Sequence, residues 1–90
     1  MRINGNDYIL EWVQPRGGPV AFHRGDCDPP EATNPTIRIC ATLQGEELLD
    51  TLIHECLHAS AFQILDEEYV LATATDIARE LWALGWRRVT

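Results

Sequence analysis

Apolar residues recur along the chain in two strand-like patterns and two helix-like patterns. Residues 8–13 are rich in strand-forming side chains and end just before Pro15. Residues 36–43 alternate, with Ile37 and Ile39 on one face and polar or smaller residues between them. We therefore expect one strand over 8–13 and a second, half-buried strand over 36–43.

The segments between these two strands are rich in turn-forming residues. Residues 16–19 contain two Gly and a Pro and predict a turn, after which residues 20–23 form a short strand that closes a hairpin. His23 ends this strand, where facing solvent is commoner than contacting a metal or a substrate. Residues 25–35 hold three Pro and predict an irregular loop. A loop this long in so small a domain commonly serves a function or is disordered.

Residues 46–63 carry apolar side chains around most of a helical wheel. Glu46 and Glu47 open this segment with negative charge, which the first turn of a helix favours. A helix that is apolar on nearly all sides is buried. We therefore expect it to lie between the sheet and another helix, with His54 and His58 facing a cleft.

A second helix is predicted to start at Glu67, with Asp66 as its N-cap and Gly85 as the residue that stops it. Trp86 is then expected to fold back onto the helix pair. Together these elements predict an α+β fold in which a small antiparallel or mixed sheet packs on two helices. The core stripe predicted for the second helix comprises Val70, Ala74, Ile77, Leu81 and Leu84.

The first predicted helix contains an HExxH motif, from His54 through Glu55 to His58. Residues four apart lie one above the other on a helix, so both imidazoles can chelate one ion. Imidazole is a common zinc ligand, and Glu55 is placed to take a proton from a metal-bound water, as in zinc metallopeptidases. The alternative is two helix histidines and a surface Glu without a metal. The buried helix and the carboxylate pair that follows it favour the zinc site.

Composition and charge remove several other classes of protein. The 90 residues predict one small domain, whose stability a bound metal would raise appreciably. The formal charge of −7 argues against a nucleic-acid-binding surface. No apolar run is long enough to span a bilayer, and the N-terminus lacks the apolar core of a signal peptide. We therefore expect a cytoplasmic protein with no nucleic-acid or membrane partner.

The three cysteines, Cys27, Cys40 and Cys56, have no paired spacing, which favours free thiols in a reducing compartment. Cys56 lies on the side of the predicted helix away from the histidines and is expected to be a small core residue. Cys27 is the candidate metal ligand among them. Zinc thiolate sites usually bring cysteines in pairs, however, so we expect Cys27 not to be a ligand.

These motifs together resemble the minimal gluzincins, zinc metallopeptidase-like domains of the HExxH-then-Glu type that include the SprT-like and ImmA/IrrE-like groups. The chain looks most like small phage-encoded proteins of that kind. It departs from the larger members in having no further subdomain to form the far wall of a substrate cleft, which bears on proteolysis rather than on metal binding. The resembling stretches are residues 25–30, 36–39, 50–59, 66–68 and 81–88.

The resemblance implies zinc on His54 and His58, Glu55 as general base, and a Glu of the second helix as third ligand. We predict that this ligand is Glu67 rather than Glu68. Eight residues separate His58 from Glu67, enough for a tight reversal between helices. On a helical wheel Glu67 lies about 20° from Ala74, inside the core stripe, whereas Glu68 lies about 100° further round, towards solvent.

The function implied by the resemblance is a zinc-dependent metallopeptidase that hydrolyses a peptide or protein substrate, with Glu55 moving a proton to the leaving amine. Tyr69 and Arg38 are candidates to stabilise the oxyanion, although a packing or surface role is commoner for each. The substrate is expected to bind extended beside the strand at 36–43, with the loop at 25–34 bordering the cleft.

The alternative function is a non-catalytic binding protein that keeps zinc for stability and engages a host or virion partner. A retained general base favours the enzyme, because a purely structural site has no use for one. A closed site with four protein ligands would favour the binder. Manganese and iron are alternatives to zinc, since selectivity depends on geometry and availability.

Overall fold

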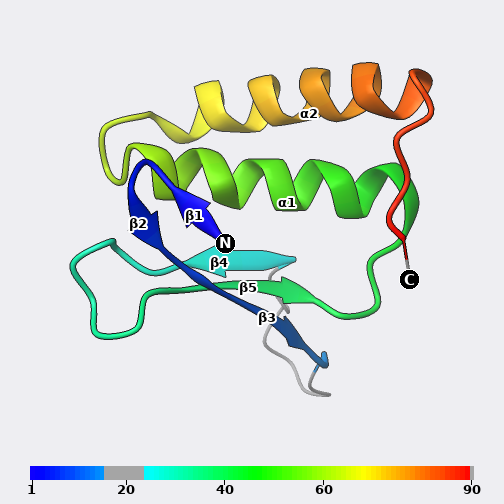
Figure 1. The fold of residues 1–90 in the computed structure, drawn as a ribbon. Helices are drawn as coiled ribbons and strands as arrows, with labels where there is room; N and C mark the ends of the chain where they lie inside the picture. Colours follow the sequence, from blue (N-terminus) through cyan, green and yellow to red (C-terminus); the bar gives the residue numbers. More distant parts are fainter. Residues whose placement is uncertain (16–23, 90) are drawn as a thin grey trace.

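The computed structural model of the protein describes residues 1–15 and 24–89. It is a small α+β fold, as predicted, in which one helix packs on the sheet and the second helix packs on the first (Figure 1). The turn predicted at 16–19, the strand predicted at 20–23 and His23 lie outside the described residues. In chain order the elements are β1 (Arg2–Ile3), β2 (Asn6–Asp7), β3 (Ile9–Val13), β4 (Gly25–Cys27), β5 (Thr36–Cys40), α1 (Gly45–Ser60) and α2 (Glu67–Ala83).

The main sheet is mixed and has the strand order β3–β5–β4. Strand β3 runs parallel to β5, with Ile9 opposite Thr36, and β4 runs antiparallel to it, with Asp26 opposite Arg38. The N-terminal strands β1 and β2 form a separate two-stranded hairpin. The predicted mixed sheet is therefore present, with β5 at its centre.

The central position of β5 corrects two expectations about residues 25–43. This strand is hydrogen-bonded along both edges, so the prediction that a substrate pairs beside residues 36–43 is wrong. Residues 25–27 were expected in an irregular loop, yet they form β4 at the end of the sheet. Pairing with β5 explains this strand, because Arg38 forms an ion pair with Asp26 directly across the ladder, at 3.0 Å.

Helix α1 lies between the sheet and α2, as predicted, and contacts β4, β5 and α2 (Figure 1). Its buried residues, Leu48, Thr51, Glu55 and Ala59, are three or four positions apart and share one face. The helix ends at Ser60, so the predicted end at residue 63 is too late. The chain reverses direction beyond it in a turn.

Helix α2 begins where the sequence predicts, because the Asp66 side chain caps it by accepting a hydrogen bond from the Tyr69 amide at 2.8 Å. Its buried residues are Val70, Ala74 and Ala78. The small alanines let the two helices lie close together, and Ile77 falls beside this stripe.

The prediction that Ile77 and Leu84 belong to the buried stripe of α2 is wrong, because Ile77 is 39% exposed and Leu84 is 76% exposed. Gly85 ends the helix as predicted, with a φ of +99° that glycine adopts without strain. The chain turns back there, since the Trp86 amide donates to the carbonyl of Leu81 at 3.1 Å. The Trp86 side chain nevertheless stays 64% exposed, so it does not pack into the helix pair as expected.

The apolar core lies between α1 and the sheet. Ile37 and Ile39 of β5 are fully buried there, and Cys56 is half-buried against the same cluster, in line with the role predicted for it. Within the described residues, no helix is long and apolar enough to cross a membrane. The core cluster comprises Tyr8, Ile37, Ile39, Leu48 and Ala59.

Candidate metal centre

The structure brings His54, His58 and Glu67 together at the interface between the two helices. The histidines stand one turn apart on α1, with ring centroids 4.9 Å apart. The Nε2 atom of His54 lies 2.9 Å from Glu67 Oε1, and the Nε2 atom of His58 lies 2.8 Å from Glu67 Oε2. Since Asp66 caps α2, Glu67 is its first residue and its carboxylate faces the end of α1.

This group can hold a metal ion. One ligand atom from each of His54, His58 and Glu67 lies within 4.8 Å of the others. Bonds of about 2.0–2.2 Å to a common ion place neighbouring ligand atoms roughly 3–3.5 Å apart, so modest side-chain rotation would accommodate one. Glu68, the alternative ligand, is exposed and does not belong to the group.

The ligand set is open on one side. His54 and His58 keep 16% and 23% of their side chains exposed, and Glu67 keeps 66%. Among the described residues, the group contains three members and no fourth His, Cys, Asp or Glu. Two imidazoles and one carboxylate with a free position form a donor set typical of catalytic rather than structural zinc sites.

Glu55 is buried on α1, only 7% exposed, where the helix meets strand β4. The two elements approach closely at Gly25. A Cβ at that position would stand 2.8 Å from the Arg38 carbonyl oxygen, 3.1 Å from Thr51 Cγ2 and 3.2 Å from Glu55 Cγ. Only glycine fits this approach, so Gly25 lets the edge strand pass directly beside the carboxylate.

Burial, together with the negative charges of Asp26 and Glu67, raises the pKa of Glu55 to about 7, and burial is the largest of these causes. A carboxylate with such a pKa can both accept and return a proton near neutral pH. Burial also raises the pKa of the Cys27 thiol to about 11, and the Glu55 charge contributes. Cys27 is therefore a neutral thiol, and it lines the same hollow as Glu55 and His58.

Arg38 is held by two carboxylates. Its guanidinium contacts Asp26 at 3.0 Å and Asp28 at 2.9 Å, and these hydrogen bonds, first that of Asp28, raise its pKa. It organises β4 and the following loop. Tyr69, the other candidate for oxyanion stabilisation, is 53% exposed and lies outside the three-residue group.

Two surface hollows flank the group, and Glu55 lines both of them. One, of about 360 Å³, also borders Cys27, His58 and Phe62. The other, of about 390 Å³, borders Gly25 and His54. An extended chain that passed from one hollow to the other would run along β4 and across the metal-binding group.

One feature of the sequence is compatible with the strand that borders this site. Gly25 stands beside alternating Asp and Cys, and a glycine in such a strand commonly marks a close approach to another element.

Comparison of the chain with protein-family models, curated proteins and solved structures found no match.

Proposed function

We propose that this protein is a zinc-dependent metallopeptidase with a minimal, zincin-like fold. The observation that carries the proposal is the pairing of an open His54, His58 and Glu67 group with a buried glutamate one residue from the first histidine. A purely structural metal site gains nothing from burying an additional carboxylate. Hydrolysis, in contrast, needs a base that stays close to the metal and away from bulk water.

In this proposal His54, His58 and Glu67 bind the ion, and Glu55 handles the proton. Bound zinc supplies Lewis-acid polarisation and makes a water molecule acidic. The Glu55 carboxylate would accept a proton from the attacking water as the water oxygen bonds to the peptide carbonyl carbon. Glu55 would then give that proton to the amide nitrogen as the C–N bond breaks. The products are an amine and a carboxylic acid, which ionises to the carboxylate in water.

The substrate that suits this arrangement is an extended polypeptide lying along β4. This strand ends the sheet order, it borders Glu55 through Gly25, and its two ends adjoin the two hollows. An added strand would bind by main-chain hydrogen bonds and fill the hollows with alternate side chains. The position replaces the predicted one beside residues 36–43, because β5 has no free edge.

The decisive experiment compares the Glu55→Gln variant with the parent protein, both loaded with zinc. Gln has nearly the shape of Glu but cannot accept a proton at neutral pH. We expect peptide hydrolysis to fall by about 10²–10⁴-fold, the usual contribution of general-base catalysis, while zinc content stays unchanged. The assay is cleavage of a mixed peptide library followed by mass spectrometry, with metal content measured on the same samples.

Glu68→Gln is the matched control, because it changes an exposed glutamate outside the metal-binding group. It should hydrolyse peptides as the parent does. Full activity in zinc-loaded Glu55→Gln would reject the mechanism. Zinc binding without hydrolysis in any of the three proteins would instead support the non-catalytic binding protein.

A further inference from the structure

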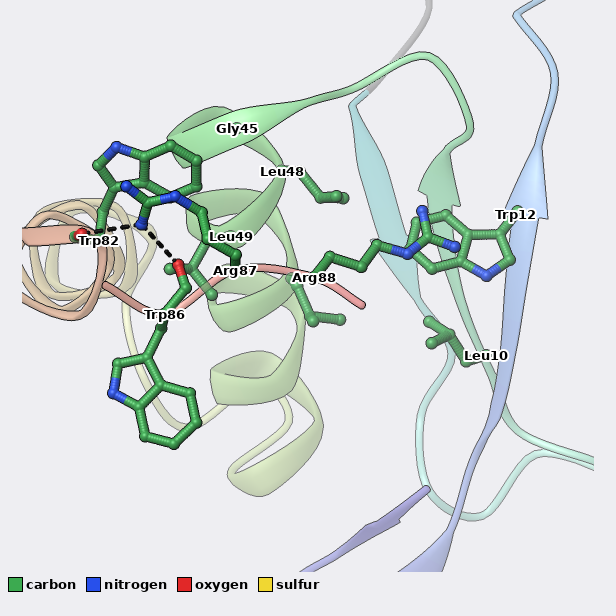
Figure 2. A pocket seen from close by; sticks show the side chains of 10 residues that line it. Leu10, Trp12, Gly45, Leu48, Leu49, Trp82, Trp86, Arg87 and Arg88 are labelled. Carbon is green, nitrogen blue, oxygen red and sulfur yellow. Dashed lines mark hydrogen bonds between the residues drawn. The ribbon is translucent and has the colours of Figure 1, made fainter. Parts of the chain in front are cut away.

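A larger cavity lies at the opposite end of the helix pair from the metal-binding group. It measures about 490 Å³ and opens between strand β3, the start of α1 and the chain that follows α2 (Figure 2). Leu48 and Leu49 of α1 form an apolar base between the indole of Trp12 on one side and that of Trp82 on the other. Trp86 also lines it, so all three tryptophans of the chain contribute to the lining of this one cavity.

Two arginines complete the walls of this cavity. The guanidinium carbon of Arg87 lies 3.4 Å from the centroid of the Trp82 ring, and that of Arg88 lies 4.0 Å from the Trp12 ring. Arg87 Nη1 also donates to the carbonyl oxygens of Trp82 and Trp86, at 2.9 and 2.8 Å (Figure 2). Stacking thus holds both cations beside an apolar hollow, and hydrogen bonding also fixes Arg87.

These cations differ from the other arginines that the structure describes in one respect. Within the described residues Arg87 and Arg88 form no ion pair with a carboxylate, in a chain whose formal charge is −7. Arg87 retains the N–H groups of its Nε and Nη2 atoms for a further acceptor. The arginines that do form ion pairs with carboxylates are Arg2, Arg24, Arg38 and Arg79.

We propose that this cavity binds a small organic anion, an aryl or acyl carboxylate whose apolar body enters between the tryptophans while its carboxylate meets Arg87 and Arg88. Charge complementarity identifies the head of the ligand, since unpaired guanidinium groups bind carboxylates by charge-assisted hydrogen bonds. The apolar lining identifies its body.

The size of the cavity favours a small molecule over a protein partner. Its volume falls within the roughly 300–1,000 Å³ typical of small-molecule sites, which are mostly apolar with a few placed polar groups. Ten residues line it, whereas specific protein interfaces engage roughly 20–30 residues on each side.

The test uses the full chain and follows the indole N–H signals of Trp12, Trp82 and Trp86 by two-dimensional NMR. Phenylbutyrate is titrated against phenylbutyramide, a neutral analogue of almost the same shape. We expect phenylbutyrate to shift the indole signals saturably at millimolar concentration and to bind at least about tenfold more tightly than the amide. This comparison needs no variant, so it decides the matter even where a substitution harms folding.

The Arg87→Gln/Arg88→Gln variant should lower phenylbutyrate affinity to that of the amide. Arg79→Gln is the matched control, since Arg79 pairs with Asp76 on α2 and does not line the cavity. Equal affinity for acid and amide, or no saturable shift at all, would overturn the proposal. Indole signals that move on dilution without ligand would identify a second copy of the chain as the occupant. Tighter binding of a short acidic peptide containing one phenylalanine would identify a polypeptide instead.

Discussion

A single position on α2 separates the carboxylate that meets the histidines from one that does not. Successive helix residues point about 100° apart, so Glu67 and Glu68 cannot both face α1. The Asp66 cap and the core stripe together indicate the rotation of the first turn, and this rotation favours Glu67. The oxygens of Glu67 lie 2.9 and 2.8 Å from the two imidazoles, whereas Glu68 is exposed.

We expect Glu67→Gln to lower zinc affinity far more than Glu68→Gln. Loss of an outer-sphere partner typically weakens metal binding by about 10–100-fold, and loss of a direct ligand should exceed that. Competition with a zinc-binding dye would measure both affinities under one set of conditions. A Glu68→Gln variant that loses zinc while Glu67→Gln retains it would show the ligand assignment to be wrong.

Asp28 connects the loop between β4 and β5 to two residues of β5. Its carboxylate accepts hydrogen bonds from the Arg38 guanidinium and from the Thr36 amide, at 3.0 Å. The bonds from Arg38, the larger cause, and from Thr36 lower the pKa of Asp28. The folded state therefore stabilises the ionised form of Asp28 relative to the unfolded state.

The Asp28→Asn variant should be less stable than the parent at neutral pH, by about 1.5–3 kcal/mol, the usual contribution of hydrogen bonds to a charged group. Folding lowers the pKa of Asp28, so its contribution to the free energy of unfolding is fully present above the pKa of the unfolded state, which is about 4. The contribution is lost as the pH falls through the pKa of the folded state. Urea unfolding at several pH values should show the difference narrowing in acid. A difference that stayed constant down to strongly acidic pH would contradict the assignment to charge.

Among the elements, the helices were predictable and the edge strand was not. Periodic apolar positions and acidic first turns mark both helices locally, and Asp66 also caps α2. These signals do not depend on what the helix packs against. Strand β4 reads Gly-Asp-Cys, and Gly and Asp are both poor strand formers. Its structure comes from pairing with β5, a contact between distant parts of the chain that no local pattern contains.

The same distinction explains the error at Ile77. A sequence stripe is naturally built from the larger apolar residues, but α2 packs against α1 through Val70, Ala74 and Ala78. Close helix packing selects small residues at the contact, and a larger neighbour is then left beside it. The predicted stripe and the observed contact face thus share Val70 and Ala74, and they differ in that Ala78 takes the place predicted for Ile77. Which of these neighbours lies at the contact depends on the helix that α2 packs against.

We expect Gly25→Ala to disturb β4 and the site together. The new Cβ would lie 2.8 Å from a backbone oxygen of β5, which cannot move aside as a flexible side chain can. Such overpacking typically costs about 1–3 kcal/mol of the free energy of unfolding. Denaturant unfolding would measure it, and peptidase activity should fall as well, since Glu55 Cγ is among the crowded atoms. A variant as stable and active as the parent would show that the strand and helix have room to separate.

At the scale of the whole molecule, a metal ion would join the two helices at the end where the chain reverses between them. His54 and His58 come from α1 and Glu67 from α2, so one ion would cross-link the layers of a 90-residue chain whose core is small. It would also offset the repulsion among acidic groups at this end, where Asp26 and Glu67 both raise the pKa of Glu55. The ion should therefore contribute to folding as well as to chemistry.

Removing zinc with a chelator should lower the melting temperature markedly. A ligand present at about a thousand times its Kd stabilises the folded state by about 4 kcal/mol. For a domain of this size each kcal/mol shifts Tm by about 4–8 °C, so chelation should lower Tm by roughly 15–30 °C. His58→Ala provides the matched comparison, because it should melt near the chelated parent and respond little to chelator. A parent protein whose Tm is unchanged by chelation, although it binds zinc beforehand, would show that the ion does not hold the two helices together.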